Sequence, residues 1–406
     1  MAAHPKIFIA LPVMAESDWL PACLDSITKQ IFQNFYIVAC VNQPESYRND
    51  ENKNHICADN AKCLDILSEY HQEKVTVIDH STKGKGWNKK SGIGYARKVI
   101  MDFIAAHAEE NDIILSLDAD TTFGENYFES VIDNFSKFPN AAALSNPYYH
   151  KLTFSEKEDR AILRYEIYMR NYAINLLSIN SPYAFTALGS AIALPVSAYK
   201  AIGGMTPKQS GEDFYFLQKL KKYGSIIIHN TEKVFPAARF SDRVFFGTGP
   251  AMIKGDQGDW SSYPVYHHSL FADIKETYDA FPKLFIRTAE TPVSRFSGEQ
   301  FAETDIWQPL RKNFRKEENF IRACHEKLDG LRILQYLKQK QSGLNITDEK
   351  CLNENIEKVF RNVLPFNSII NYSIPDFMKS SIKELNVIRD YLVATEEIFQ
   401  EKIIFL

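Results

Sequence analysis

The sequence predicts an α/β domain with a mostly parallel central sheet, followed by an α-helical C-terminal extension. Through the first 150 residues, short apolar runs alternate with longer segments whose apolar residues recur at helical spacing. The last 120 or so residues contain few strand-like runs and several amphipathic helical patterns. A chain of 406 residues is long enough for two such units. We therefore expect a domain over residues 1–275 and a helical extension over residues 276–406.

Four short runs are the predicted strands, and the first and the fourth have the apolar sequence expected of buried parallel strands. They are 6–11 (KIFIAL), 35–41 (FYIVACV), 74–79 (KVTVID) and 112–117 (DIILSL). Right-handed crossovers put the loops that follow parallel strands at one edge of the sheet, where such folds bind ligands. We therefore expect Pro12, Glu16, Asn42 and Asp118 to lie near one another at that edge.

Helical patterns separate and follow these runs. Ser17 is a plausible N-cap for a first helix whose apolar face comprises Leu20, Leu24, Ile27 and Ile31. Later segments at helical spacing are 155–178, a helix opened by Gly211, and, in the extension, 319–337 and 379–400. Further strands are expected at 189–194 and 225–229.

Composition and charge exclude several classes of protein. The net charge of −4 gives no electrostatic basis for nucleic acid as a partner. The six cysteines are dispersed without a CxxC pair, which favours reduced thiols over disulfides or zinc fingers. Neither a signal peptide nor a run of roughly 20 apolar residues is visible. We expect a cytoplasmic protein, with contact to the inner face of the membrane left open for the tail.

Asp118-Ala119-Asp120, directly after the fourth strand, is the strongest chemical signal. Side chains two residues apart at a strand end point to the same side. Two carboxylates there suit a hard cation, Mn²⁺ or Mg²⁺, that also binds substrate phosphates. The alternative is that Asp120 only caps a following helix and Asp118 is a solvated loop residue.

Four segments together resemble family 2 glycosyltransferases with the GT-A fold, over roughly residues 6–245. They are IFIALPVMAES with CLDSITKQ, SGIGYARK leading into ILSLDAD, GSAIALP running into AIGGMTP, and GEDFYFLQKLKKYG. The resemblance implies metal-dependent sugar transfer from a nucleotide-sugar donor, a UDP- or GDP-sugar, to an acceptor hydroxyl. The acceptor, whether a glycan, a lipid-linked sugar or a small molecule, is not readable from the sequence.

The resemblance also implies roles for single residues. Asp213 matches the general base of inverting relatives, with Glu212 beside it, although acidic residues are favoured in a first helical turn regardless of function. Many relatives end the second strand with an aspartate that helps recognise uracil, whereas this chain has Asn42, with Glu45 as a substitute that could reach in. The identity of the nucleotide therefore stays open.

Basic residues are needed near the donor diphosphate, which gains negative charge as it leaves. Arg97, Arg239 and Arg243 are the candidates, because arginine suits phosphate oxygens. Lys85 and Lys89 in the glycine-rich loop are better explained as ordinary surface charges.

Other functions compete with this hypothesis. A nicotinamide-dependent dehydrogenase needs glycines in the first strand-to-helix turn, and residues 12–17 contain none. A sugar nucleotidyltransferase shares the metal chemistry but usually has a first loop rich in glycine and arginine. A catalytically silent scaffold that binds a partner through its tail is a third reading. The tail's one-sided apolar faces also fit a shaped acceptor site or a homodimer interface.

Overall fold

The computed structural model describes residues 5–70, 72–88, 92–208, 211–241, 247–302, 304–365, 375–404 and 406. Contacts divide the chain into two compact units. We call residues 1–162 and 186–257 the sheet unit, and residues 163–185 and 258–404 the helical unit. This grouping places residues 163–185 and 258–275 with the tail, and a functional boundary near residue 275 stays a prediction.

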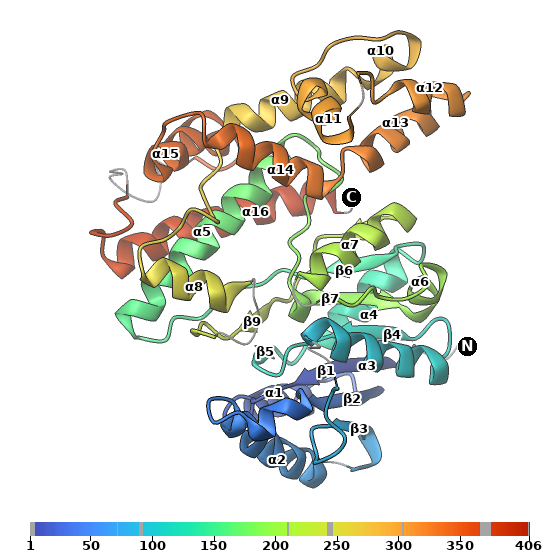
Figure 1. Cartoon of the computed structure of the whole chain (residues 1–406), viewed down its shortest axis with the longest axis vertical. Helices are drawn as coiled ribbons and strands as arrows, with labels where there is room; N and C mark the ends of the chain where they lie inside the picture. The colour runs from blue at the N-terminus through green and yellow to red at the C-terminus, as the bar shows by residue number, and fades with distance from the viewer. Residues whose placement is uncertain are drawn as a thin grey trace. The chain divides into compact units, whose positions relative to one another are not determined.

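The sheet unit is built on a seven-stranded sheet in the order β3-β2-β1-β4-β7-β6-β8 (Figure 1). Only β7 runs against its neighbours β4 and β6, so the sheet is mostly parallel, as predicted. A second, two-stranded sheet joins β5 and β9. The strands are β1 (Ile7–Val13), β2 (Phe35–Asn42), β3 (Val75–His80), β4 (Ile113–Ser116), β5 (Thr121–Phe123), β6 (Ala143–Ser145), β7 (Ile192–Pro195), β8 (Ile226–Ile227) and β9 (Val234–Pro236).

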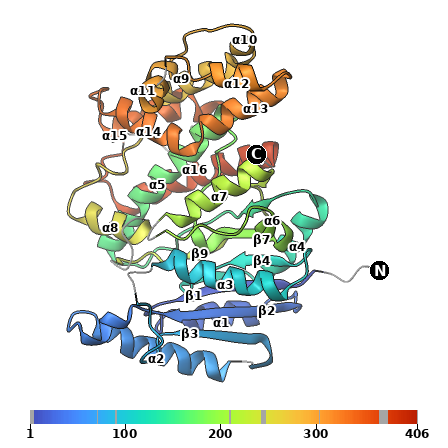
Figure 2. The ribbon, with the colours of Figure 1, turned by 45° about the vertical axis from the view of Figure 1, so that its right-hand side comes forward.

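Helices follow the strands of this unit, and α3 packs on β1 and β2 (Figure 2). The crossovers to β2 and β3 run in one direction along the sheet and the crossover to β4 runs in the other. Right-handed connections therefore put α1 and α2 on one face and α3 on the opposite face. The helices are α1 (Leu20–Thr28), α2 (Asn54–Glu69), α3 (Ile93–His107), α4 (Tyr127–Lys137), α6 (Val196–Ala201), α7 (Glu212–Tyr223) and α8 (Thr248–Asp256).

The core of the sheet unit lies between these layers. Every residue of β1 is buried, which explains its almost uninterrupted apolar sequence. Pro12 is tolerated inside this central strand because the pairing of β1 with β4 ends at Ala10 and Ser116, before the proline is reached.

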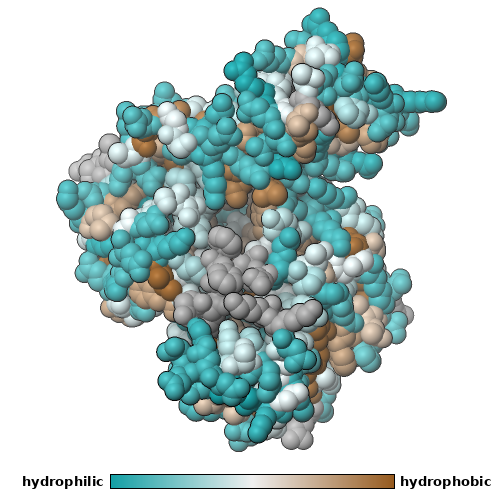
Figure 3. All heavy atoms as spheres, viewed as in Figure 1, coloured by the Kyte–Doolittle hydropathy of each residue, from teal (hydrophilic) through white to brown (hydrophobic). Residues whose placement is uncertain are grey.

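The helical unit contains most of α5 (Glu156–Ser178), which begins in the sheet unit. The other helices are α9 (His268–Asp279), α10 (Phe281–Ile286), α11 (Ser294–Phe301), α12 (Gln308–Asn313), α13 (Glu317–Lys327), α14 (Gly330–Gln341), α15 (Asp348–Lys358) and α16 (Ile382–Ile403). No helix among the described residues is both long and apolar enough to cross a membrane. The face drawn in Figure 3 is mostly hydrophilic.

Several local expectations are wrong, and tertiary contacts explain why. Ser17 does not cap α1; its hydroxyl donates to Asp59 Oδ2 at 2.6 Å, and α1 begins after Trp19 without a side-chain cap. Ile31 lies beyond the end of α1 and is 57% exposed. The strand expected at 225–229 is reduced to Ile226–Ile227.

The single helix expected over 319–337 is two helices. The side chain of Asp329 accepts a hydrogen bond from the backbone N–H of Arg332, so it caps a new helix, α14, after α13 has ended. The apolar residues keep helical spacing across 319–337, so that spacing alone does not reveal the break that the Asp329 carboxylate makes by capping α14.

Candidate active site

Two acidic residues leave β4 at the carboxyl edge of the parallel strands. β4 ends at Ser116, and the N–H of Thr121 donates to the carbonyl of Asp118 at 3.0 Å, which closes a tight turn before β5. Ala119 is buried beneath this turn. The Asp118 and Asp120 side chains keep 31% and 16% of their surface exposed, so both carboxylates can be reached from solvent.

Arg239, after β9, joins Asp120 to Glu16, after β1. Its Nη2 lies 2.6 Å from Asp120 Oδ2 and 2.7 Å from Glu16 Oε2, and its Nε donates to the same Asp120 oxygen at 3.0 Å. The guanidinium carbon also lies 5.1 Å from the centre of the Trp19 ring. Burial alone would lower the pKa of Arg239, but the two carboxylates outweigh it and raise that pKa. The arginine is therefore held in its charged form.

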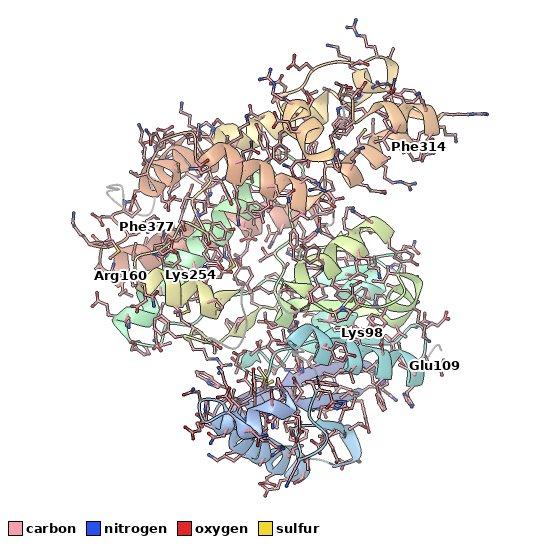
Figure 4. All side chains as sticks on the ribbon, in the orientation of Figure 1. Lys98, Glu109, Arg160, Lys254, Phe314 and Phe377 are labelled. Carbon is pink, nitrogen blue, oxygen red and sulfur yellow. The ribbon has the colours of Figure 1, made fainter. Side chains whose placement is uncertain are left out.

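Arg97, on α3, joins Asp118 to Glu212, the first residue of α7. Nη2 of Arg97 donates to Asp118 Oδ1 and Nη1 donates to Glu212 Oε1. The Arg97 side chain is only 3% exposed, whereas Lys98 beside it lies on the outer side of α3 (Figure 4). A Cβ at Gly189 would collide with the Arg97 guanidinium, so glycine leaves the room that this pair needs. We call Glu16, Arg97, Asp118, Asp120, Glu212 and Arg239 the edge cluster.

Asp213 follows Glu212 in the first turn of α7. The helix is preceded by Gly211 in the left-handed region at φ 68°, a conformation that glycine adopts without strain. Asp213 Oδ1 accepts from the N–H of Phe214 at 2.8 Å. Burial, and then the negative charge of Glu212, raise the pKa of Asp213 to about 7, although the charge of Arg97 and the hydrogen bond from the Phe214 N–H act to lower that pKa. A carboxylate of this pKa can accept a proton near neutral pH.

Asn42, which was expected to meet the nucleotide base, is buried. The Asn42 amide donates to the carbonyls of Val13 and Cys40 at 3.0 and 3.3 Å, and its Oδ1 faces Trp87 Nε1 at 3.4 Å. Asn42 therefore ties the end of β2 to the end of β1 and to the glycine-rich loop.

Glu45 binds the backbone of the glycine-rich loop. Its carboxylate accepts from the N–H groups of Gly84 and Gly86 at 3.0 and 2.9 Å, and these bonds lower its pKa. The ring of Trp87 stacks on His80, with centroids 3.8 Å apart. A backbone-binding glutamate gives the loop a fixed shape at the edge where Asn42 lies.

The structure thus brings most of the expected site residues into one unit. Glu16, Asp120 and Arg239 meet, Arg97 links Asp118 to Glu212, and Pro12 and Asn42 lie on the paired strands β1 and β2. Arg243 and Lys89 lie outside the described residues. Lys85 is an exposed surface charge that pairs with Asp79 at 3.0 Å.

Two participants were not found from the sequence. Trp19 lies against Arg239, and no pattern distinguishes it from an ordinary aromatic at a helix start. The space-making role of Gly189 was also missed, although a glycine just before the strand at 192–195 is a signal of close approach.

Residues 8–190 match the family model of glycosyl transferase family 2. The chain carries a family 2 glycosyltransferase domain. The protein is accordingly a glycosyltransferase. The match includes Glu16, Arg97, Asp118 and Asp120 but ends before α7 and Arg239. A search of curated proteins gave no match to the chain.

Solved glycosyltransferase structures are similar to the chain at low sequence identity. Staphylococcus aureus TarS 1–349 in complex with UDP-GlcNAc is 12% identical, with 80% of this chain and 91% of that chain covered and a TM-score of 0.42. The mannosyltransferase PcManGT from Pyrobaculum calidifontis, in complex with GDP-Man and Mn²⁺, is also 12% identical, with 97% and 86% covered and a TM-score of 0.37. Fold class and family agree with the expectation from the sequence.

Proposed function

We propose that the protein is a metal-dependent, inverting glycosyltransferase in which Asp118 and Asp120 hold Mn²⁺ or Mg²⁺ and Asp213 is the general base. The observation that carries this proposal is the Arg97 bridge. It connects Asp118, at the end of β4, to Glu212, next to Asp213 on α7. Asp118, which we propose binds the cation, and Glu212, which adjoins the proposed base, therefore belong to one connected cluster.

The residues present suit a hard divalent cation. The donor set consists of carboxylate oxygens, which such cations prefer. Both hydrogen bonds from Arg239 to Asp120 go to Oδ2, and Arg97 bonds to Oδ1 of Asp118. Arg239 and Arg97 would thus hold the two carboxylates in place for the cation. When bound, the cation would neutralise charge on the donor's diphosphate.

The chain's own groups would do the remaining work. Arg239, held beside Asp120 by Glu16, would place a positive charge where the leaving diphosphate gains negative charge. Asp213 would accept the proton of the acceptor hydroxyl as its oxygen attacks the anomeric carbon from the opposite face. Through its two ion pairs, Arg97 would fix the position of Glu212, and hence of the start of α7, relative to Asp118.

The donor class and the metal requirement can be tested together. UDP-GlcNAc and GDP-mannose, which the S. aureus and P. calidifontis proteins bind, are the first donors to offer, with water as the acceptor. We expect release of nucleoside diphosphate with Mn²⁺ and its loss on chelation. Asp120→Asn should greatly weaken nucleotide binding in Mn²⁺, and Asp133→Asn, an exposed aspartate on α4, should not.

Equal nucleotide affinity with and without Mn²⁺ would show that the metal assignment is wrong. Formation of a nucleotide-sugar from a nucleoside triphosphate and a sugar phosphate would instead favour the nucleotidyltransferase reading. Absence of any turnover across the donor series would favour the silent scaffold. The cytoplasmic location, the acceptor and a dimer through the tail stay predictions.

A further inference from the structure

Two consecutive histidines in the helical unit face a glutamate from another helix. His267 immediately precedes α9 and His268 begins it, while Glu354 lies on α15. Nε2 of His267 lies 2.9 Å from Glu354 Oε2, and the two imidazole centroids are 4.2 Å apart. One ligand-type atom from each of the three side chains lies within 4.8 Å of the others.

The backbone that carries the two histidines is fixed by buried amides. The carbonyl of Tyr266 accepts from Asn171 on α5 at 3.1 Å and from Asn355 on α15 at 2.8 Å. Oδ1 of Asn355 accepts from the N–H of His268 at 2.6 Å. Because Asn355 follows Glu354 directly, the same bonds that fix the histidines also fix the glutamate. Ligands held in this way lose little entropy when they bind.

The hydrogen bonds of His267 permit two tautomers. If Nδ1–H donates to Ser269 Oγ, 2.8 Å away, the lone pair of Nε2 faces the Glu354 carboxylate, and the two acceptors need either a proton or a metal cation between them. Metal-binding histidines commonly donate their second N–H to a neighbouring oxygen in this manner. In the other tautomer, Nδ1 accepts from the N–H of Ser269 at 3.3 Å and Nε2–H donates to Glu354, which makes His267 a helix cap.

We propose that His267, His268 and Glu354 form a binding site for Zn²⁺ or a similar transition-metal ion, which joins the start of α9 to α15. Two imidazole nitrogens and one carboxylate oxygen are typical zinc ligands, whereas Mg²⁺ and Ca²⁺ prefer oxygen alone. A tetrahedral Zn²⁺ with bonds of about 2.0–2.1 Å needs ligand atoms about 3.4 Å apart. The three ligand atoms lie within 4.8 Å of one another, so the His268 ring and the Glu354 carboxylate would have to move closer when the ion binds.

Access and charge are compatible with this assignment. The His267 side chain is 9% exposed and that of Glu354 is 28% exposed, so a fourth position is open to water. The exposed Lys350 lies 3.9 Å from Oε1 of Glu354, on the other oxygen of that carboxylate, and leaves Oε2 directed at His267. This site belongs to the helical unit and shares no residue with Asp118 and Asp120.

Metal titration of the full chain tests the proposal. After dialysis against a chelator, the protein is titrated with Co²⁺, whose visible absorption is strong in a four-coordinate nitrogen and oxygen site and weak in a six-coordinate oxygen site. The four-coordinate spectrum separates the His267 site from a cation held by Asp118 and Asp120. We expect one four-coordinate Co²⁺ per chain, displaced by Zn²⁺, and a Zn²⁺-dependent rise in Tm.

Matched variants locate the site. His268→Gln and Glu354→Gln should weaken Zn²⁺ binding roughly tenfold or more, since even neighbours of ligands have effects of that size. His107→Gln, on α3, and Glu349→Gln, in the first turn of α15, should bind Zn²⁺ as the wild type does. Equal Tm values of all five proteins in chelator would show that each variant folds.

A helix cap alone gives a different result. In that case Co²⁺ produces no four-coordinate spectrum, or Glu354→Gln and His268→Gln bind Zn²⁺ as tightly as Glu349→Gln does. Either outcome overturns the proposal. Because the readouts are metal binding and Tm, they do not depend on the proposed transferase activity.

Discussion

Both units place arginines among carboxylates, but the two clusters differ in their access to solvent. In the helical unit, Arg170 on α5 bonds Glu166 at 2.8 Å and Glu396 on α16 at 2.7 Å, and these side chains are at most 4% exposed. In the sheet unit, Asp118 and Asp120 keep 31% and 16% of their side-chain surface exposed. The first cluster is closed to solvent, whereas the second is buried at Arg97 and Glu212 and open at Asp118 and Asp120, which can exchange one partner for another.

We infer that the cluster in the helical unit stabilises the fold, whereas the edge cluster takes part in catalysis. Glu166 also accepts from Arg389 on α16 at 3.4 Å, so the four side chains Glu166, Arg170, Arg389 and Glu396, which we call the helix clamp, tie α5 to α16. An ion pair in such surroundings is costly to break because the remaining charge stays buried. The edge cluster also consists of arginine–carboxylate ion pairs, but it lies at the carboxyl ends of the parallel strands. There a cation or a phosphate can replace a protein side chain as the partner.

The largest effect on stability is expected in the helix clamp. Glu166→Gln leaves Arg170 and Arg389 without their shared carboxylate and should lower the free energy of unfolding by about 3–5 kcal/mol. Urea denaturation measures this change. Lys29→Gln, which removes an exposed partner of Asp25, should cost no more than about 0.3–0.5 kcal/mol. Equal losses in the two variants would contradict the distinction between sealed and open clusters.

The edge cluster should show the opposite pattern. Arg239→Gln should lower turnover about 10²–10³-fold, the effect of removing one donor to a developing negative charge. It should destabilise the fold less than Glu166→Gln does, because Asp120 can still be solvated and Glu16 is the one largely buried carboxylate that loses a partner. Lys254→Gln, an exposed charge on α8 (Figure 4), is the matched control and should retain wild-type turnover. A large loss of stability in Arg239→Gln without a loss of turnover would make Arg239 a structural residue.

The pH dependence of turnover should reveal the titration of Asp213 on α7. Burial raises the pKa of Asp213 to about 7, so the basic form is scarce in acid and complete in mild alkali. Turnover should therefore rise about tenfold per pH unit below 7 and level off above it. Stability has the opposite sign, because a raised carboxyl pKa favours the folded state in acid and loses that contribution as pH rises through 7. A pH-independent turnover between 5 and 8 would exclude Asp213 as the titrating base.

The sequence predicted best what depends on local pattern. β1, β2 and β4 appear as apolar runs, since burial on both faces leaves little polar alternation, and Asp118 and Asp120 follow β4 directly. The edge strand β3 is partly exposed and its sequence, VTVIDH, is less apolar. The order of the segments identified the family. These features need no knowledge of distant contacts.

What the sequence could not predict depends on partners far along the chain. Ser17 has the chemistry of a helix cap but bonds Asp59, and Glu45 has the chemistry of a base-binding acid but holds the glycine-rich loop. Arg97 was expected near the donor phosphates, and its two ion pairs with Asp118 and Glu212 could not be predicted from the sequence. In each case the residue type indicated which kind of bond the side chain would make. The partner lies far along the chain, so the spacing of residues in the sequence could not identify it.

One experiment tests the central claim, that the edge cluster and Asp213 form a catalytic centre. Turnover of the donor and affinity for its nucleoside diphosphate are measured with Mn²⁺ in wild type, Asp213→Asn and the control Asp133→Asn. We predict that Asp213→Asn lowers turnover about 10²–10⁴-fold while nucleotide affinity stays nearly unchanged, as for an interaction made mainly in the transition state. Near wild-type turnover in Asp213→Asn would contradict the account and make Asp213 an acidic residue of a helix start.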